Sequence, residues 1–395
     1  MKRLLATTLF FTSASVVQAH DGIMHTTSSA AASYDWALDI MLSYRDQPAA
    51  VARGFLPING HSENAGLNLQ HVDISRDFRW NDRWNNKQTA RVTLSSHDDG
   101  AEVDEAWATQ TYGAWSLRFG QQRLDLGLRN VLHEHNWTMI SPTLVNQVFW
   151  GGQTAEAGIN LQHESQQGNW WFRQQLGGFS TSLFETNGAS AAALASSVLG
   201  YRNAGRLAGI KLDLYHANLQ DRGLNLFSLN PQQHSHGSTA TEFFDGHLTQ
   251  FGLSLFVHQS ITAGTFSFES EYQQRQERGA LRSAAGQTTD ATANLQLDSW
   301  GGYAEASFKA NNGLIAAVRH EWLGSDVALS EVASSDLTTS VLNQAGDDPQ
   351  RQIMLLGYRF NDQGNTTVKY QWQQQNSWLR GSAQWQLLAQ QSYRF

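Results

Sequence analysis

The sequence contains no cysteine among its 395 residues. This absence excludes a disulfide framework and metal sites built on thiolates. After residues 1–19 the chain also lacks any apolar run of about eighteen or more residues, the length that a transmembrane helix needs. No linker, repeat or low-complexity tract divides it. The chain is therefore neither a disulfide-stapled domain nor a helical membrane protein, and we expect one folded unit.

The first nineteen residues, MKRLLATTLFFTSASVVQA, place Lys2 and Arg3 before an apolar run and small residues before His20. This pattern is typical of a signal peptide. We therefore expect residues 1–19 to be removed, residues 20–33 to form a periplasmic tail, and residues 34–395 to fold. Loss of Lys2 and Arg3 would leave 25 of the 27 basic residues against 35 acidic ones, a net charge of −10. That balance argues against nucleic acid as a partner.

The last twelve residues, QWQLLAQQSYRF, alternate between apolar and polar side chains. Trp385, Leu387 and Ala389 fall on one face of an extended strand, whereas Gln384, Gln386 and Gln390 fall on the other. In a membrane barrel the first face contacts lipid and the second faces the lumen. The terminal Phe395 also resembles the C-terminal signature that the outer-membrane barrel assembly machinery reads. The alternative is an edge strand of a soluble β-sandwich.

The same alternation recurs along the chain, for example at 251–257, 266–273 and 366–373. In water these segments would expose a large apolar surface, which a bilayer would cover. The 14 tryptophans and 10 tyrosines cluster near the ends of such segments, where interfacial girdles are expected. We therefore predict an all-β fold, a transmembrane antiparallel β-barrel in the bacterial outer membrane, with outer-membrane lipid as its partner.

Counting these segments gives about sixteen strands, with fourteen to eighteen as the range. The two strands that fix the count are 204–215 and 222–229. The Ala/Ser-rich run at 189–198 falls in a predicted loop, 179–203. Sixteen strands would enclose a water-filled lumen, and the short stretch before the first strand predicts no plug domain. Connections after even-numbered strands are mostly short, whereas long ones, expected to be extracellular, follow odd-numbered strands at 45–63, 124–153, 179–203, 230–246, 275–296 and 324–349.

Charged residues of both signs lie just before and at the start of the loop at 124–153, the third of the expected extracellular loops. General porins resemble this layout, and their long third loop folds into the barrel and narrows it. Opposed charges at a constriction would set a transverse field and select solutes by charge and size. The alternative is that they pair along the wall and only neutralise one another. The candidate pore residues are Arg118, Arg123, Arg129, Glu102, Asp104 and Glu105.

The same loop contains the stretch NVLHEHNWTMISP at 130–142. His133 and His135 would point to the same side of an extended segment and could contact one zinc or copper ion, with Glu134 beside them. A third ligand would have to come from another loop. The alternative is that both imidazoles bond to the wall or to water. The N-terminal stretch HDGIMH, with His20 and His25, is a second candidate for loose zinc or copper binding.

Residues 102–163 resemble a family of bacterial outer-membrane β-barrels described as zinc-regulated outer-membrane receptors or porin-like proteins. The resemblance rests on EVDEAWATQT at 102–111, on WSLRFGQQRLDLGLRN at 115–130, and on the spacing of Asn130, His133, His135 and Trp137. It implies a link to zinc through regulation and makes Asn130 and Trp137 candidate anchors of the loop. Thr138 and Met139 depart from the family pattern, which removes a possible carboxylate ligand.

No Gly-x-Ser-x-Gly motif is present, and no acidic pair beside a histidine marks a catalytic site, so we do not expect an enzyme. The function predicted from the sequence is a porin-like channel for passive diffusion of small solutes, including metal ions or their complexes. It requires no cofactor and could assemble as a homotrimer, as many porins do. A receptor or adhesin without an open pore, or a barrel hydrolase, is the alternative.

Overall fold

The computed structural model describes residues 34–46, 55–56, 65–81, 86–97, 100–132, 136–184, 186, 190–224, 242–283, 292–330, 348–360, 366–376 and 384–394. Among these residues, no helix is both long and apolar enough to span a membrane. The predicted signal peptide, the N-terminal tail and Phe395 lie outside the described residues.

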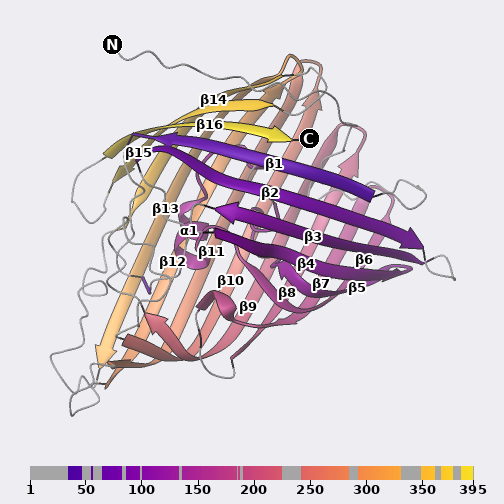
Figure 1. Ribbon diagram of the computed structural model, residues 1–395. Coiled ribbons are helices and arrows are strands. Elements are labelled where there is room, and N and C mark those ends of the chain that lie inside the picture. Colours follow the sequence, from indigo (N-terminus) through magenta and orange to yellow (C-terminus); the bar gives the residue numbers. More distant parts are fainter. Residues whose placement is uncertain are drawn as a thin grey trace.

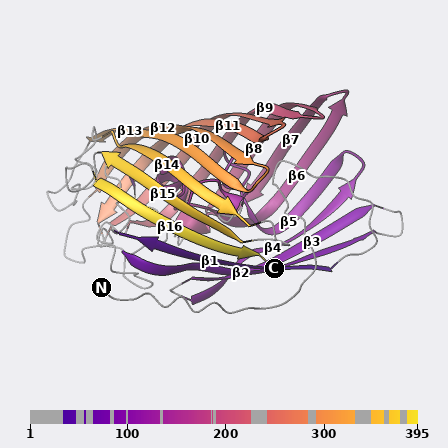
Figure 2. The same ribbon diagram turned by 90° about the horizontal axis from the view of Figure 1, so that it is seen from above.

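The chain forms a closed barrel of sixteen antiparallel strands, as predicted (Figures 1 and 2). Each strand pairs with its neighbours in sequence, and β1 closes the ring against β16, with Ile40 opposite Tyr393. The strands are β1 Tyr34–Arg45, β2 Gly66–Asn81, β3 Lys87–His97, β4 Gly100–Tyr112, β5 Trp115–Arg123, β6 Ala155–Gln167, β7 Trp170–Phe179, β8 Ala191–Asn203, β9 Arg206–Leu224, β10 Glu242–Ile261, β11 Gly264–Ser283, β12 Thr292–Ala310, β13 Leu314–Ser330, β14 Gln350–Arg359, β15 Thr367–Asn376 and β16 Gln384–Arg394. Two short helices lie between strands, α1 at Leu144–Trp150 and the 3-10 turn η2 at Ser182–Phe184.

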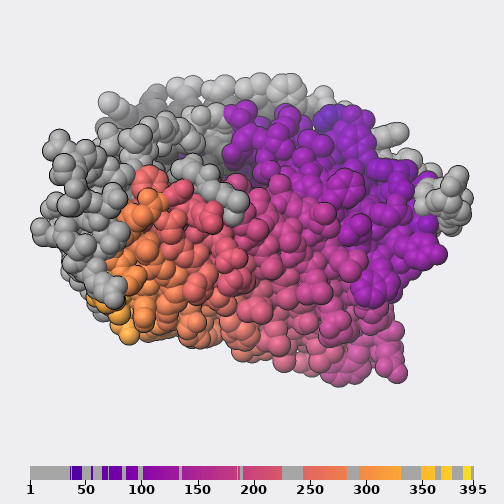
Figure 3. Space-filling model, turned by 90° about the horizontal axis from the view of Figure 1, so that it is seen from below, coloured from indigo at the N-terminus to yellow at the C-terminus, as the bar shows by residue number. Residues whose placement is uncertain are grey.

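The alternation of side chains defines an apolar outer wall. On β9, Ile210, Leu212 and Leu214 are exposed, whereas Lys211 and Asp213 between them are buried inside the barrel. Exposed large apolar side chains follow the same pattern around the ring, and Figure 3 shows the wall as a continuous surface in chain order. This outer surface needs lipid to cover it, and the fold therefore places the chain in the bacterial outer membrane.

One side of the barrel is taller than the other. Strands β9 to β13 contain 17 to 20 residues, whereas β5 has 9 and β7 has 10. About ten tilted residues suffice to cross a bilayer. The long strands therefore extend beyond the membrane as a raised wall.

The prediction for residues 179–229 was wrong in detail. Residues 191–198 of the Ala/Ser-rich run, which was expected in a loop, belong to β8. Two strands were expected at 204–215 and 222–229, but residues 206–215 and 222–224 belong to one continuous strand, β9, which pairs with β8. The count of sixteen is unchanged because β8 replaces the strand lost in this way. Small side chains hide the alternation on β8, where Ala192 and Ser196 face a loop packed inside the barrel.

The expectation of a water-filled lumen is wrong for a large part of the interior. Residues 124–132 and 136–154, here called the lumen loop, fold into the barrel together with α1 (Figure 1). Leu126, Phe149 and Trp150 from this loop form an apolar core with inward side chains of the wall, among them Tyr215 and Phe244. The loop at 124–153 was expected to be an extracellular loop that folds into the barrel and narrows it. Its described residues do lie inside the barrel, where they form the packed centre of the molecule.

Candidate functional site

The lumen loop contains one short helix with a defined start and end. Thr143 caps α1 through its hydroxyl, which accepts a hydrogen bond from the backbone N–H of Asn146 at 3.2 Å. Gly151, with φ 65°, ends the helix in the left-handed conformation. Leu144, Val145, Phe149 and Trp150 of α1 are buried against the wall.

Acidic and amide side chains of the wall accept hydrogen bonds from backbone N–H groups of the loop. Glu271 on β11 accepts from Leu128 at 2.7 Å, and Glu321 on β13 accepts from Leu144 at 3.0 Å. Two further bonds of this kind join Gly127 to Asp213 and Ile140 to Gln371. The wall therefore pairs donors that an irregular segment inside a barrel would otherwise leave unsatisfied.

Basic side chains of the wall do the same for backbone carbonyl groups. Lys369 on β15 donates to the carbonyl of Trp137 at 2.6 Å, and Arg319 on β13 donates to that of Ser141 at 2.9 Å. Arg275 on β11 donates to the carbonyl of Phe149 at 2.9 Å, and Lys211 on β9 donates to that of Asp125 at 3.0 Å. The loop is thus held on its main chain from β9 to β15.

Asp125 provides a charged anchor at the start of the loop. Its carboxylate lies 2.7 Å from Lys211 Nζ and 3.2 Å from a terminal nitrogen of Arg173, and it accepts a hydrogen bond from Ser196. Burial alone would raise the pKa of Asp125, but the charges of Lys211 and Arg173 outweigh it and hold the pKa well below its ordinary value. Asp125 is therefore ionised at neutral pH.

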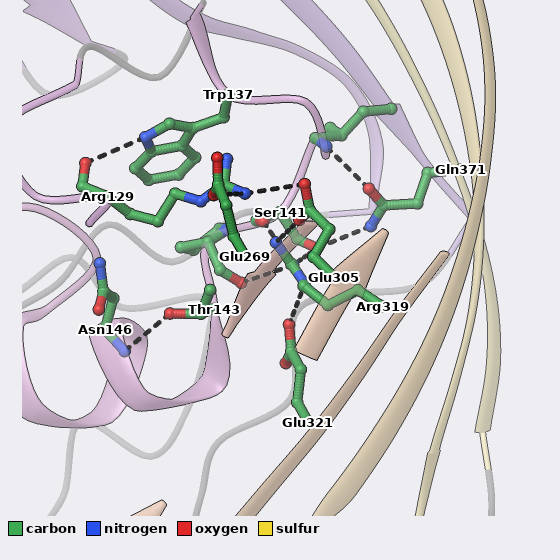
Figure 4. A network of polar contacts seen from close by, with 12 residues as sticks. Arg129, Trp137, Ser141, Thr143, Asn146, Glu269, Glu305, Arg319, Glu321 and Gln371 are labelled. Atoms are coloured by element: carbon green, nitrogen blue, oxygen red, sulfur yellow. Dashed lines mark hydrogen bonds and ion pairs between the residues drawn. The ribbon is translucent and has the colours of Figure 1, made fainter. Parts of the chain in front are cut away.

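Arg129 is the second charged anchor (Figure 4). It forms ion pairs with Glu269 on β11 and, at 2.8 Å, with Glu305 on β12. Burial lowers the pKa of Arg129, but the two glutamates raise it well above its ordinary value. Glu305 also lies 3.4 Å from Arg319, which pairs in turn with Glu321. These groups form one buried network under the loop.

Asn130 and Trp137 lie at two junctions of the loop. The side-chain amide of Asn130 donates to the carbonyls of Leu124 and Thr154 at 2.7 and 2.9 Å, and its oxygen accepts from the Thr154 N–H. These bonds join the entry and the exit of the loop. The indole N–H of Trp137 donates to the carbonyl of Arg129 at 3.2 Å and joins these two points of the loop (Figure 4).

The six predicted pore residues do not form two opposed walls. Arg123 pairs with Asp104 and lies 4.0 Å from Glu105, so charges of both signs meet at one place on β4 and β5. Arg129 lies instead against β11 and β12, across the lumen loop.

The other two predicted residues stand apart from that ion pair. Glu102 is exposed near the start of β4. Arg118 donates to Thr109 and lies over the ring of Trp107.

The candidate metal ligands His133, Glu134, His135, His20 and His25 all lie outside the described residues. Within the part of the chain that the structure describes, no group of three or more His, Asp or Glu side chains could hold a metal ion.

Sequence reasoning missed the wall residues that hold the loop. The sequence does contain one signal for these wall residues. They are charged or amide residues at inward positions of strands whose outward positions are apolar. Such positions normally face water, and nothing local indicates that a distant loop occupies them. The residues are Lys211, Asp213, Glu271, Arg275, Glu305, Arg319, Glu321, Arg351, Lys369 and Gln371.

Together, the closed ring, the apolar outer wall and the inserted loop define an outer-membrane β-barrel of sixteen strands. No protein-family model matches the sequence, and no curated protein matches it either.

Solved structures with the same fold do exist. The outer membrane channel DcaP of Acinetobacter baumannii aligns at a TM-score of 0.55 and 11% identity, over 94% of this chain and 99% of that one. The trimer form of OmpT, an outer membrane protein of Vibrio cholerae, aligns at 0.54 and 10% identity, over 93% and 100%. OmpF of Salmonella typhi, in complex with daunomycin, aligns at 0.52 and 12% identity, over 92% and 97%. At this identity the likeness shows the fold alone.

Proposed function

We propose that the chain is a passive outer-membrane channel for small solutes, narrowed by the lumen loop. The observation that carries the proposal is an asymmetry inside the barrel. Charged side chains under the loop are sealed from water, with Arg319 2% and Glu321 0% exposed. On β2 to β4, opposite them, Arg79 is 33%, Arg91 18% and Asp104 20% exposed, although Asp73 and Glu105 on the same strands are only 6% and 7% exposed. The path for solutes would run along this second side.

The fixed position of the loop supports a permanent constriction. Its main chain is bonded to β9, β11, β13 and β15, and none of these strands adjoins β2 to β5. The side-chain oxygen of Gln153, near the end of the loop, accepts a hydrogen bond from Arg123 on β5. An ion passing along β2 to β5 would therefore meet a fixed edge rather than a flap.

Planar-bilayer recording of the purified protein tests this function. We expect stepwise KCl conductance, because ions can follow the partly exposed charges of Arg79, Arg91 and Asp104 on β2 to β4. Arg123→Gln is the control, since a change in ion selectivity would assign the current to this lumen and not to a contaminant. A wild-type protein that folds as a heat-modifiable barrel but conducts no ions would contradict the channel and favour a closed receptor, an adhesin or a hydrolase.

We also propose that three copies assemble, as the trimer form of the Vibrio cholerae protein does. The mass of the detergent-solubilised protein, measured by light scattering, tests this assembly. A mass of one chain at all detergent concentrations would exclude it.

A link to zinc, or to copper, remains a proposal that rests on the sequence resemblance and on His133 and His135. Zinc titration by calorimetry should show a site in the wild type that is lost in the His133→Ala, His135→Ala double variant. The His20→Ala, His25→Ala variant separates the N-terminal cluster from the loop. Equal binding by all three proteins would remove both clusters from consideration.

A further inference from the structure

Arg118 on β5 is held in a fixed orientation by two neighbours on β4. Its Nε donates to the hydroxyl of Thr109 at 3.0 Å, and its guanidinium carbon lies 4.1 Å from the centre of the Trp107 ring. The stacked ring covers one face of the guanidinium and Thr109 occupies one edge. The edge that carries the two terminal nitrogens is left open.

Other arginines of this side of the lumen are neutralised by carboxylates. Arg91 binds Asp77 through two nitrogens at 2.7 and 2.9 Å, Arg173 binds Asp125, and Arg123 binds Asp104. Among the described residues, no carboxylate lies within ion-pair distance of Arg118.

Glu105, the nearest acidic candidate, is engaged elsewhere. It accepts a hydrogen bond from the indole of Trp107 at 3.1 Å and lies 3.9 Å from Arg91. Glu105 and Asp125 therefore act on the charge of Arg118 only from beyond ion-pair distance, and no hydrogen bond to a described residue occupies its two terminal nitrogens.

The side chain of Arg118 is half-buried, and its terminal nitrogens are not among the sealed polar atoms of the lumen. A planar fork of this kind matches the two oxygens of a carboxylate. Because the stacked ring and the Thr109 bond fix the fork in advance, little side-chain entropy remains to be lost on binding.

We propose that Arg118 is a binding subsite for the carboxylate group of small organic anions that enter the lumen. The proposal rests on the proposed channel function, since it supposes that solutes reach this wall. Thr109 and Trp107 act as positioning residues, and the terminal nitrogens of Arg118 contact the solute.

Benzoate, with benzamide as the neutral molecule of matched shape, is a suitable probe. In bilayers, benzoate should reduce the KCl current through the wild type in a saturable way, and benzamide should not. Arg118→Gln should weaken the apparent affinity for benzoate by about tenfold or more, because hydrogen bonds between charged groups are lost. Arg118→Lys keeps the positive charge but lacks the planar pair of terminal nitrogens. Its apparent affinity for benzoate should lie between those of the wild type and Arg118→Gln.

Arg79→Gln is the matched control, because it removes a charge from the same side of the lumen but from an arginine already paired with Asp77. It should bind benzoate like the wild type. Equal benzoate affinity in wild type and Arg118→Gln, with KCl current intact, would overturn the subsite and leave the channel.

If neither the wild type nor any variant conducts, equilibrium binding of radiolabelled benzoate to the detergent-solubilised barrel tests the subsite instead. Binding to the wild type that is lost in Arg118→Gln supports the subsite. No binding to the wild type, or equal binding to both proteins, overturns it.

Discussion

Gly127 of the lumen loop lies directly against the carboxylate of Glu271 on β11. A Cβ atom at Gly127 would collide with both carboxylate oxygens, and the backbone there has φ +58°, which favours glycine. Glu271 in turn holds the next N–H of the loop, that of Leu128. A change at this one contact should therefore loosen the loop.

Gly127→Ala should lower the thermal midpoint of the barrel in detergent. Backbone strain should reduce the free energy of unfolding by roughly 1–3 kcal/mol, and displacement of the Glu271 carboxylate should reduce it further. Gly168→Ala is the control, because Gly168 has the same φ of +58° but no atom near a Cβ. The excess destabilisation of Gly127→Ala over Gly168→Ala measures the Glu271 contact. Equal effects of both variants would show that this contact contributes nothing.

Arg129→Gln should destabilise the protein strongly, since it removes the cation that Glu269 and Glu305 share and leaves only Arg319 beside the buried Glu305. Breaking a buried ion pair costs about 3–5 kcal/mol, whereas exposed pairs contribute about 0–1 kcal/mol. Arg282→Gln is the matched exposed case, because Arg282 pairs with Asp221 and Asp245 while it is 40% exposed. Denaturant unfolding of both variants should separate them clearly, and similar midpoints would contradict a buried network.

Asp125→Asn tests the pH dependence of the loop anchor. The pKa of Asp125 is lower in the folded protein than in the unfolded chain, where it is about 3.9. The stability that Asp125 contributes is therefore complete above about pH 4 and is lost as pH falls through the folded value. The gap in thermal midpoint between wild type and Asp125→Asn should be constant from pH 7 to 5 and should shrink in stronger acid.

The control for this experiment is Asp298→Asn, which removes a carboxylate that is 34% exposed and paired with Arg278. Its effect should be small at every pH. A gap for Asp125→Asn that already closes between pH 7 and 5 would show that Lys211 and Arg173 do not hold the carboxylate ionised.

Arg123 and Asp104 should have opposite effects on ion selectivity. Arg123→Gln removes the cation that pairs with Asp104 and leaves only Arg91 close to Glu105, so the reversal potential in a KCl gradient should shift toward cation preference. Asp104→Asn should shift it toward anions. Glu102→Gln, at an exposed position near the start of β4, should change it least. Shifts of the same sign for the first two variants would place this pair outside the ion path.

The fold could be predicted from the sequence because lipid on one side of the wall makes apolar and polar side chains alternate along most strands. Ile210, Leu212 and Leu214 show this pattern. β8 was missed because alanine and serine fill both of its faces, so that neither composition nor alternation marks it as a strand.

Less of the candidate site than of the fold could be predicted from the sequence. The start of the loop at 124 was predicted, but not that Glu271 or Lys369, far along the chain, would bind its backbone. Such pairings depend on where a loop lies inside a closed ring, which no local pattern encodes.

Apart from the charged anchors Asp125 and Arg129 and the apolar core, the wall binds the lumen loop through peptide N–H and carbonyl groups, which almost every residue type provides. The side chains of Val131, Leu132 and Asn136 are only partly buried and therefore contribute little to fixing the path of the loop. Substitutions at these positions should therefore leave the path of the loop unchanged.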